Sequence, residues 1–228
     1  MQNFGGFQQA FGPGVSAQVS RQKYLRHKYP GFSTEKAEQW DADRRRPLTP
    51  AEIILARSIY ASAIRYDQVS VYQKNYRGIP LGAAHAPDGN IYFPPGTGYR
   101  EDFGGATNYR QRSVFIHELC HVWQHQRGVI LPVNIIIQWK PGIEQTSDGP
   151  KLRNSKNYIY AHMFQASDRR RLFTSLDLEA QAEFMSDYYL VKNGRLASMA
   201  ENRGFSRSDY ESSLPTAMRN AGVGTPTS

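Results

Sequence analysis

Apolar side chains at helical spacing mark residues 48–64 as the first long helix of the chain. Thr49 suits the N-cap position, and Pro50 suits the first helical position, where its missing N–H costs nothing. The apolar positions are Ile53, Ile54, Ala56, Ile59 and Tyr60. We expect this helix to pack in the core.

Alternation of apolar and polar side chains replaces the helical pattern in residues 67–76 and 90–95, which are rich in β-branched and aromatic residues. Prolines and glycines bound both stretches. The pattern predicts strands of a small sheet. Residues 133–140 are apolar over a length that suits a strand or a buried helix, and both remain open.

Two further long helices follow the predicted sheet. One begins after residues 107–112 and ends at Gly128, a residue that suits the position just past a helix. The other covers residues 178–194, with Thr174 and Asp177 forming a capping box before it and Asn193-Gly194 ending it. Shorter amphipathic stretches, 196–202 and 208–214, should pack behind it. These elements predict an α+β fold with a mostly helical C-terminal part.

The two ends of the chain lack any periodic apolar pattern. Residues 1–20 are rich in Gly, Gln and Phe, and residues 219–228 in Gly, Thr and Ser. We therefore expect a flexible N-terminal segment, a single domain over residues 21–218 and a flexible tail. A length of 228 residues suits one such domain.

Composition and charge indicate where the protein is made and which kinds of partner it binds. Residues 1–20 lack the basic start and apolar run of a secretory signal, and no stretch is apolar enough to span a bilayer. The only cysteine, Cys120, cannot form an internal disulfide, which is compatible with synthesis in a reducing cytosol. A net charge of +8 favours anionic partners, but the basic runs 44–46 and 169–171 are short and lack interleaved aromatics. A nucleic-acid partner is therefore not predicted.

Candidate chemistry lies in the sequence FIHELCHVWQHQRG, residues 115–128. On a helix, His117 and His121 stand one turn apart on one face, so both imidazoles can bind one metal ion. Glu118 is rotated by about 100° from the first histidine, beside the metal, where it can take a proton from water. It is the only carboxylate between Val114 and Trp123, in an otherwise apolar helix.

A catalytic zinc site needs a third protein ligand. His125 lies roughly 12 Å beyond His117 along the axis at about 1.5 Å per residue, too far to share one ion. The metzincin extension also fails, because it requires glycine at position 124 and histidine at position 127, where this chain has Gln and Arg. The remaining candidate is Glu179 in LEAQAE, with Glu183 one turn further along the same face.

HELCH followed by a helix with E-A-Q-A-E resembles the gluzincin group of zinc metallopeptidases. The resemblance implies a zincin-like fold, Zn²⁺ as the cofactor, Glu179 as the third ligand and Glu183 as the carboxylate that supports a ligating histidine. Glu183 stands where many members have aspartate. The implied activity is hydrolysis of peptide bonds by a metal-activated water, with Glu118 as the general base.

A narrower resemblance, to bacterial Vgr-related metallopeptidase and toxin-type domains, rests on residues 90–94, 115–124 and 179–182. It implies a type VI secretion effector that leaves the cell by a signal-independent route, with secretion-apparatus and immunity-protein partners. The substrate would be a protein or the peptide of bacterial cell wall. The resemblance to gluzincins also implies a Tyr or His outside the motif helix that donates to the oxyanion. Tyr158, Tyr160 and His162 are the candidates, of which we select Tyr160 and His162.

Two other functions remain open. The first is a non-catalytic interaction or delivery protein with a structural metal site, although such a site needs no base at Glu118. The second is a nucleic-acid-binding module, which rests on the net charge alone.

Overall fold

The computed structural model describes residues 33, 35, 44–78, 82–129, 143–146, 149–152, 160–165 and 173–219. The contacts of the backbone divide the chain into two compact units, Met1–Pro47 and Leu48–Ser228. The described part of the first unit includes strand β1, Arg45–Pro47. All elements discussed below belong to the second unit. The predicted flexible ends lie outside the described residues, except for Arg219.

The first helix, α3, spans Pro50–Tyr60 and begins as the sequence predicts. The hydroxyl of Thr49 accepts a hydrogen bond from the Glu52 amide at 3.0 Å, and the Glu52 carboxylate accepts one from the Thr49 amide at 2.9 Å. The same carboxylate accepts the amide of Phe103 at 2.9 Å. One buried side chain therefore caps the helix and holds a distant loop against it.

Two short strands of the predicted sheet are present in this unit. Strands β2, Ser70–Tyr72, and β3, Ile91–Tyr92, pair in parallel with Val71 opposite Ile91. Strands β4, Ile143–Thr146, and β5, Gly149–Leu152, form an antiparallel pair that the sequence analysis did not predict. The ambiguous stretch 133–140 lies outside the described residues.

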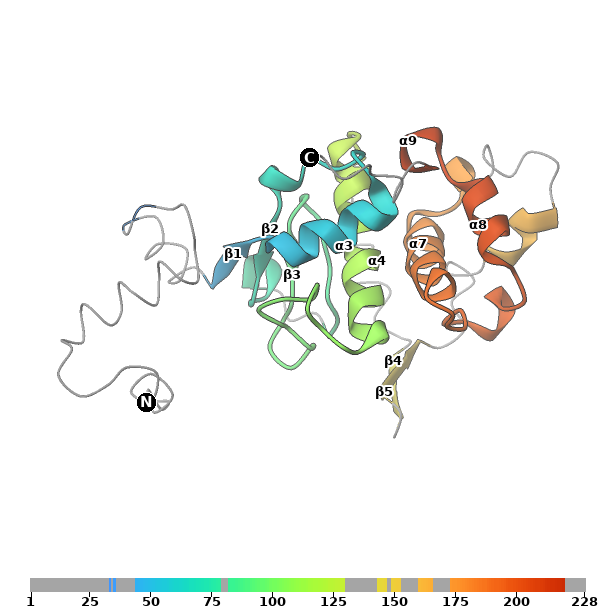
Figure 1. Ribbon diagram of the computed structural model, residues 1–228. Coiled ribbons are helices and arrows are strands. Elements are labelled where there is room, and N and C mark those ends of the chain that lie inside the picture. The colour runs from blue at the N-terminus through green and yellow to red at the C-terminus, as the bar shows by residue number, and fades with distance from the viewer. Residues whose placement is uncertain are drawn as a thin grey trace. The chain divides into compact units, whose positions relative to one another are not determined.

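The two long helices α4, Tyr109–Gln126, and α7, Leu178–Lys192, pack against each other (Figure 1). Helix α4 begins at the cap residue Asn108, whose side chain accepts the amide of Arg110, and it is followed by Gly128 at a φ of 86°. That left-handed conformation confirms the predicted role of the glycine, since other residues adopt it at a cost. Both helices bury most of their middle turns.

The predicted capping box before α7 is wrong. Asp177 is the N-cap residue and its side chain makes no capping hydrogen bond, while Thr174 lies in a separate helical turn over residues 173–175. Because α7 begins at Leu178, Asp177 and not Thr174 is the residue that precedes its first turn. The stretch 196–202 forms only a short 3₁₀ helix, Ala200–Asn202, whereas the second amphipathic stretch forms α8, Arg207–Ser213. A last helix, α9, covers Thr216–Arg219.

Aromatic side chains fill much of the interior. Phe93, Phe103 and Phe115 stack in series with centroid separations of 4.7 and 5.0 Å, which joins the sheet to α4. Phe184 on α7 packs against Tyr210 on α8 at 4.9 Å. The predicted α+β class is thus confirmed, and the zincin-like architecture stays a prediction. Among the described residues, no helix has the length and apolar character needed to cross a membrane.

Candidate metal centre

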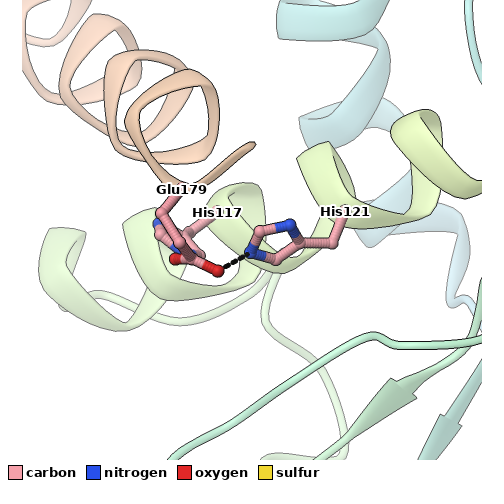
Figure 2. A group of neighbouring side chains, drawn as sticks. All are labelled: His117, His121 and Glu179. Carbon is pink, nitrogen blue, oxygen red and sulfur yellow. Dashed lines mark hydrogen bonds and ion pairs between the residues drawn. The ribbon is translucent and has the colours of Figure 1, made fainter. Parts of the chain in front are cut away.

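Helices α4 and α7 bring together the three predicted ligands. The Nε2 atom of His117 lies 3.1 Å from one carboxylate oxygen of Glu179, and Nε2 of His121 lies 3.0 Å from the other (Figure 2). The histidines project from successive turns of α4, and Glu179 reaches them from the first turn of α7. Residues 62 positions apart in the sequence therefore converge on one point.

The outer nitrogen of each histidine faces an acceptor. Nδ1 of His121 donates to the side-chain oxygen of Gln124 at 2.8 Å. Nδ1 of His117 lies 3.5 Å from the carboxylate of Glu183, a distance that is long for a hydrogen bond and close enough for an ion pair. Glu183 is thus placed where the sequence analysis expected a supporting carboxylate.

These outer contacts determine which ring nitrogen of each histidine carries the proton and which keeps the lone pair. A neutral imidazole carries one N–H and one lone pair, so a proton on Nδ1 leaves the lone pair on Nε2. Both Nε2 lone pairs then face the carboxylate of Glu179, and three acceptors point at one another. Either extra protons on the histidines or a cation between the groups must relieve this repulsion.

The geometry fits a metal ion. One ligand atom from each of His117, His121 and Glu179 lies within 4.8 Å of the others. Zinc bonds of about 2 Å at tetrahedral angles place ligand atoms about 3.3 Å apart, close to the nitrogen-to-oxygen distances found here. Two imidazoles and one carboxylate form a common donor set of catalytic zinc. His121 is buried, whereas the other two side chains are 13–15% exposed, so solvent reaches one side of the site.

Without a metal, the same contacts shift the proton affinities of the ligands. Burial alone lowers the pKa of His117, but the neighbouring carboxylates of Glu179 and Glu183 raise it well above its usual value. Burial likewise lowers the pKa of His121, and the charge of Glu179 outweighs this effect. Burial raises the pKa of Glu179, yet the two histidines hold it far below its usual range. Protons and a metal ion therefore compete for one site.

Glu118 lies beside the ligands and is 4% exposed. Burial raises the pKa of its carboxyl, although the neighbouring histidines oppose that shift. One carboxylate oxygen, Oε2, is buried without a hydrogen-bond partner among the described residues. A buried polar atom left without a partner is costly, and such atoms recur where a catalytic group must stay available. The arrangement suits a proton acceptor for water.

Of the two selected oxyanion donors, Tyr160 is buried and His162 is exposed. Tyr160 is fully buried, and its hydroxyl donates to Asp187 at 2.7 Å and bonds to the Tyr210 hydroxyl at 2.8 Å. These contacts account for Tyr160 as a core residue. His162 is exposed on the 3₁₀ helix Ala161–Gln165, and Tyr158 lies outside the described residues. No contact in the described part of the chain brings Tyr160 or His162 to the ligand group, and their catalytic roles stay predictions.

Two residues that the sequence analysis did not assign belong to the site. Gln124 accepts the N–H of His121, and its amide nitrogen donates to the side-chain oxygen of Gln181 at 3.1 Å. Both glutamines are buried. A glutamine within a helix has no distinctive sequence pattern, so the sequence offered no signal for either residue. His125 is not part of the ligand group, in agreement with the argument from helical rise.

No protein-family model matches the chain. The chain is 30% identical over 161 residues to the type VI secretion system spike protein VgrG2b of Pseudomonas aeruginosa. The match covers 67% of this chain and 14% of the spike protein, so the chain spans a small part of that relative. A solved structure, the effector domain of P. aeruginosa VgrG2b, aligns with a TM-score of 0.49 and 20% identity, covering 86% of this chain and 92% of that chain.

The sequence match confirms the coarse part of the predicted resemblance. The chain is similar to part of a Vgr-related, type VI secretion protein. Zinc binding and peptidase activity are separate predictions, which depend on the site.

Proposed function

We propose that the chain is a zinc-dependent metallopeptidase. The observation that carries the proposal is the orientation of the two histidines. Each directs Nδ1 outward to an acceptor and Nε2 inward to Glu179, beside a buried carboxylate with an unpartnered oxygen. A site that only stored a metal would have no use for that carboxylate.

Each residue has a distinct task in the proposed reaction. His117, His121 and Glu179 would hold Zn²⁺. Glu183 and Gln124 would hold the two imidazole rings with Nε2 directed toward the metal. Bound zinc supplies a Lewis acid that polarises a carbonyl and lowers the pKa of water toward about 7.

Glu118 performs the proton transfers. Its carboxylate accepts a proton as water adds to the peptide carbonyl and delivers that proton to the departing amine. In the metal-free site, burial raises the pKa of the Glu118 carboxyl above its usual value.

The similarity to VgrG2b supports a second part of the proposal, that the chain acts as a type VI secretion effector. Secretion-apparatus components and an immunity protein would then be its partners, and it would leave the cytoplasm without a classical signal. Its substrate would be a protein or a cell-wall peptide.

The test compares zinc-loaded wild type with Glu118→Gln, which removes the basic oxygen while keeping the side-chain volume. Both are incubated with a proteome-derived peptide library and with purified cell-wall peptides, and new termini are identified by mass spectrometry. We expect cleavage by wild type and a loss of about 10²–10⁴-fold in the variant. Equal cleavage by both proteins would refute the role of Glu118. Bound zinc with no cleavage of either substrate class would favour a non-catalytic metal protein.

A further inference from the structure

Gln124 occupies the junction between α4 and α7. Its side chain is 1% exposed and makes three hydrogen bonds. The oxygen accepts Nδ1–H of His121 at 2.8 Å, and the nitrogen donates to the backbone carbonyl of Leu178 at 2.8 Å and to the Gln181 side chain at 3.1 Å. One side chain therefore contacts a predicted ligand on its own helix and the start of the next helix.

The orientation of the Gln124 amide is determined by its partners. The Leu178 carbonyl only accepts hydrogen bonds, so it requires the nitrogen of Gln124 on that side. Gln181 requires the same orientation of Gln124. Its own nitrogen donates to the carbonyl of Leu176 at 2.9 Å, which leaves its oxygen to accept from the nitrogen of Gln124. The oxygen of Gln124 must then face His121. If the amide were reversed, its nitrogen would face the N–H of His121, and its oxygen would face the oxygens of Leu178 and Gln181. Neither end could then form a hydrogen bond.

This orientation selects the tautomer of His121 that carries its proton on Nδ1. An acceptor at 2.8 Å requires a proton on Nδ1, which leaves Nε2 to bind the metal. His117 receives the equivalent support from Glu183, a residue of α7. The two supports differ in one respect. Glu183 reaches from the second helix to the first, whereas Gln124 ties its own histidine to the backbone next to Glu179.

We infer that Gln124 is a positioning residue that couples the ring of His121 to the first turn of α7. Its oxygen fixes which nitrogen of His121 faces the metal, and its nitrogen fixes where α7 begins, and thereby where Glu179 stands. This inference rests on the proposed metal site. It assigns Gln124 no contact with substrate.

The first experiment measures zinc affinity by competition with a chromophoric chelator. Gln124→Met removes all three hydrogen bonds while keeping a side chain of similar size. We expect zinc to bind about 10–100-fold more weakly, the usual effect of losing such a supporting residue. The matched control is Gln126→Met, two residues further along α4, which also loses side-chain hydrogen bonds, those with the backbone of Arg65 at 2.8 and 3.2 Å. Its affinity should change by less than about threefold.

A second variant separates the contact of the Gln124 oxygen with His121 from the contacts of its nitrogen with α7. Gln124→Glu retains an acceptor for His121 but loses the donor to Leu178 and Gln181. We expect zinc affinity to fall by less than in Gln124→Met, because His121 keeps its acceptor while the link that places Glu179 is lost. The melting temperature of the metal-free protein should also fall, since the hydrogen bonds to α7 are missing. Equal loss of affinity in Gln124→Glu and Gln124→Met would overturn the assignment of the oxygen to His121.

Nuclear magnetic resonance gives a readout that does not depend on any variant folding. In the zinc-loaded wild type, long-range ¹H–¹⁵N spectra should show His121 protonated at Nδ1 and metal-bound at Nε2. Binding through Nδ1 would refute the inference. Failure of the wild type to bind zinc would refute the proposed metal site itself, whereas tight binding by wild type and Gln124→Met alike would refute only the role of Gln124.

Discussion

Asp187 provides a sharp test of how burial controls charge in this fold. Its side chain on α7 is fully buried. One carboxylate oxygen accepts the Tyr160 hydroxyl at 2.7 Å and the other accepts the Ser198 amide at 2.6 Å. Burial, with a smaller contribution from the charge of Glu183, raises the pKa of Asp187 to about 7. Its hydrogen bonds oppose that shift only in part.

The raised pKa predicts a loss of stability with increasing pH. An aspartate in an unfolded chain has a pKa near 3.9, so the folded protein holds this proton more tightly by about three pK units. At about 1.4 kcal/mol per unit, folding is weakened by up to about 4 kcal/mol once the group must ionise. The full stability is present below a pH of about 4, and it declines as the pH rises through about 7.

The variant Asp187→Asn removes the titration and keeps the shape. Its amide can donate to the Tyr160 hydroxyl, which can in turn donate to Tyr210, because either hydroxyl can be the donor in that pair. Urea unfolding of metal-free wild type and variant is followed from pH 4.5 to 8. We expect wild type to lose several kcal/mol relative to the variant across this range. A difference that stays constant with pH, or one that the exposed Asp67→Asn control reproduces, would refute the reasoning.

Three further predictions concern the fold and the site. Thr49→Ala removes the side-chain cap of α3 and should lower the free energy of unfolding by about 1 kcal/mol in urea titrations, and no change would contradict the capping role. Gly104→Ala would place a methyl group 2.2 Å from the backbone of Ala51, so its melting temperature should fall sharply, whereas Gly82→Ala, with no described atom within 4 Å, should melt near wild type. Zinc at about 100 times its dissociation constant should stabilise the protein by about 2.7 kcal/mol. The same addition should leave Glu179→Ala unchanged, and equal stabilisation of both proteins would place the metal elsewhere.

The features predicted correctly from the sequence follow local rules. The pair His117 and His121 depends only on helical spacing, and the cap at Thr49 depends only on residues within one turn. Glu179 was predicted from its place in a motif, because helical spacing alone does not say which distant carboxylate will approach α4. The contact between α4 and α7 supplies that information.

The errors and omissions come from packing. Thr174 and Asp177 have the composition of a capping box, but Thr174 belongs to a separate turn over residues 173–175 and α7 begins only after Asp177. Tyr160 and His162 are close in sequence, yet one is fully buried and the other exposed, and their catalytic roles stay predictions. Gln124 drew no prediction because a glutamine in a helix has no distinctive pattern. Only the tertiary contacts reveal its three hydrogen bonds.

Elemental analysis of the purified protein shows whether His117, His121 and Glu179 bind zinc. Wild type, Glu118→Ala and Glu179→Ala are dialysed in parallel against the same trace-metal buffer, and bound zinc is measured per chain. We expect about one zinc in wild type and in Glu118→Ala, with much less in Glu179→Ala, because Glu179 is a proposed ligand and Glu118 is not. Wild type without zinc, even after refolding in its presence, would contradict the account.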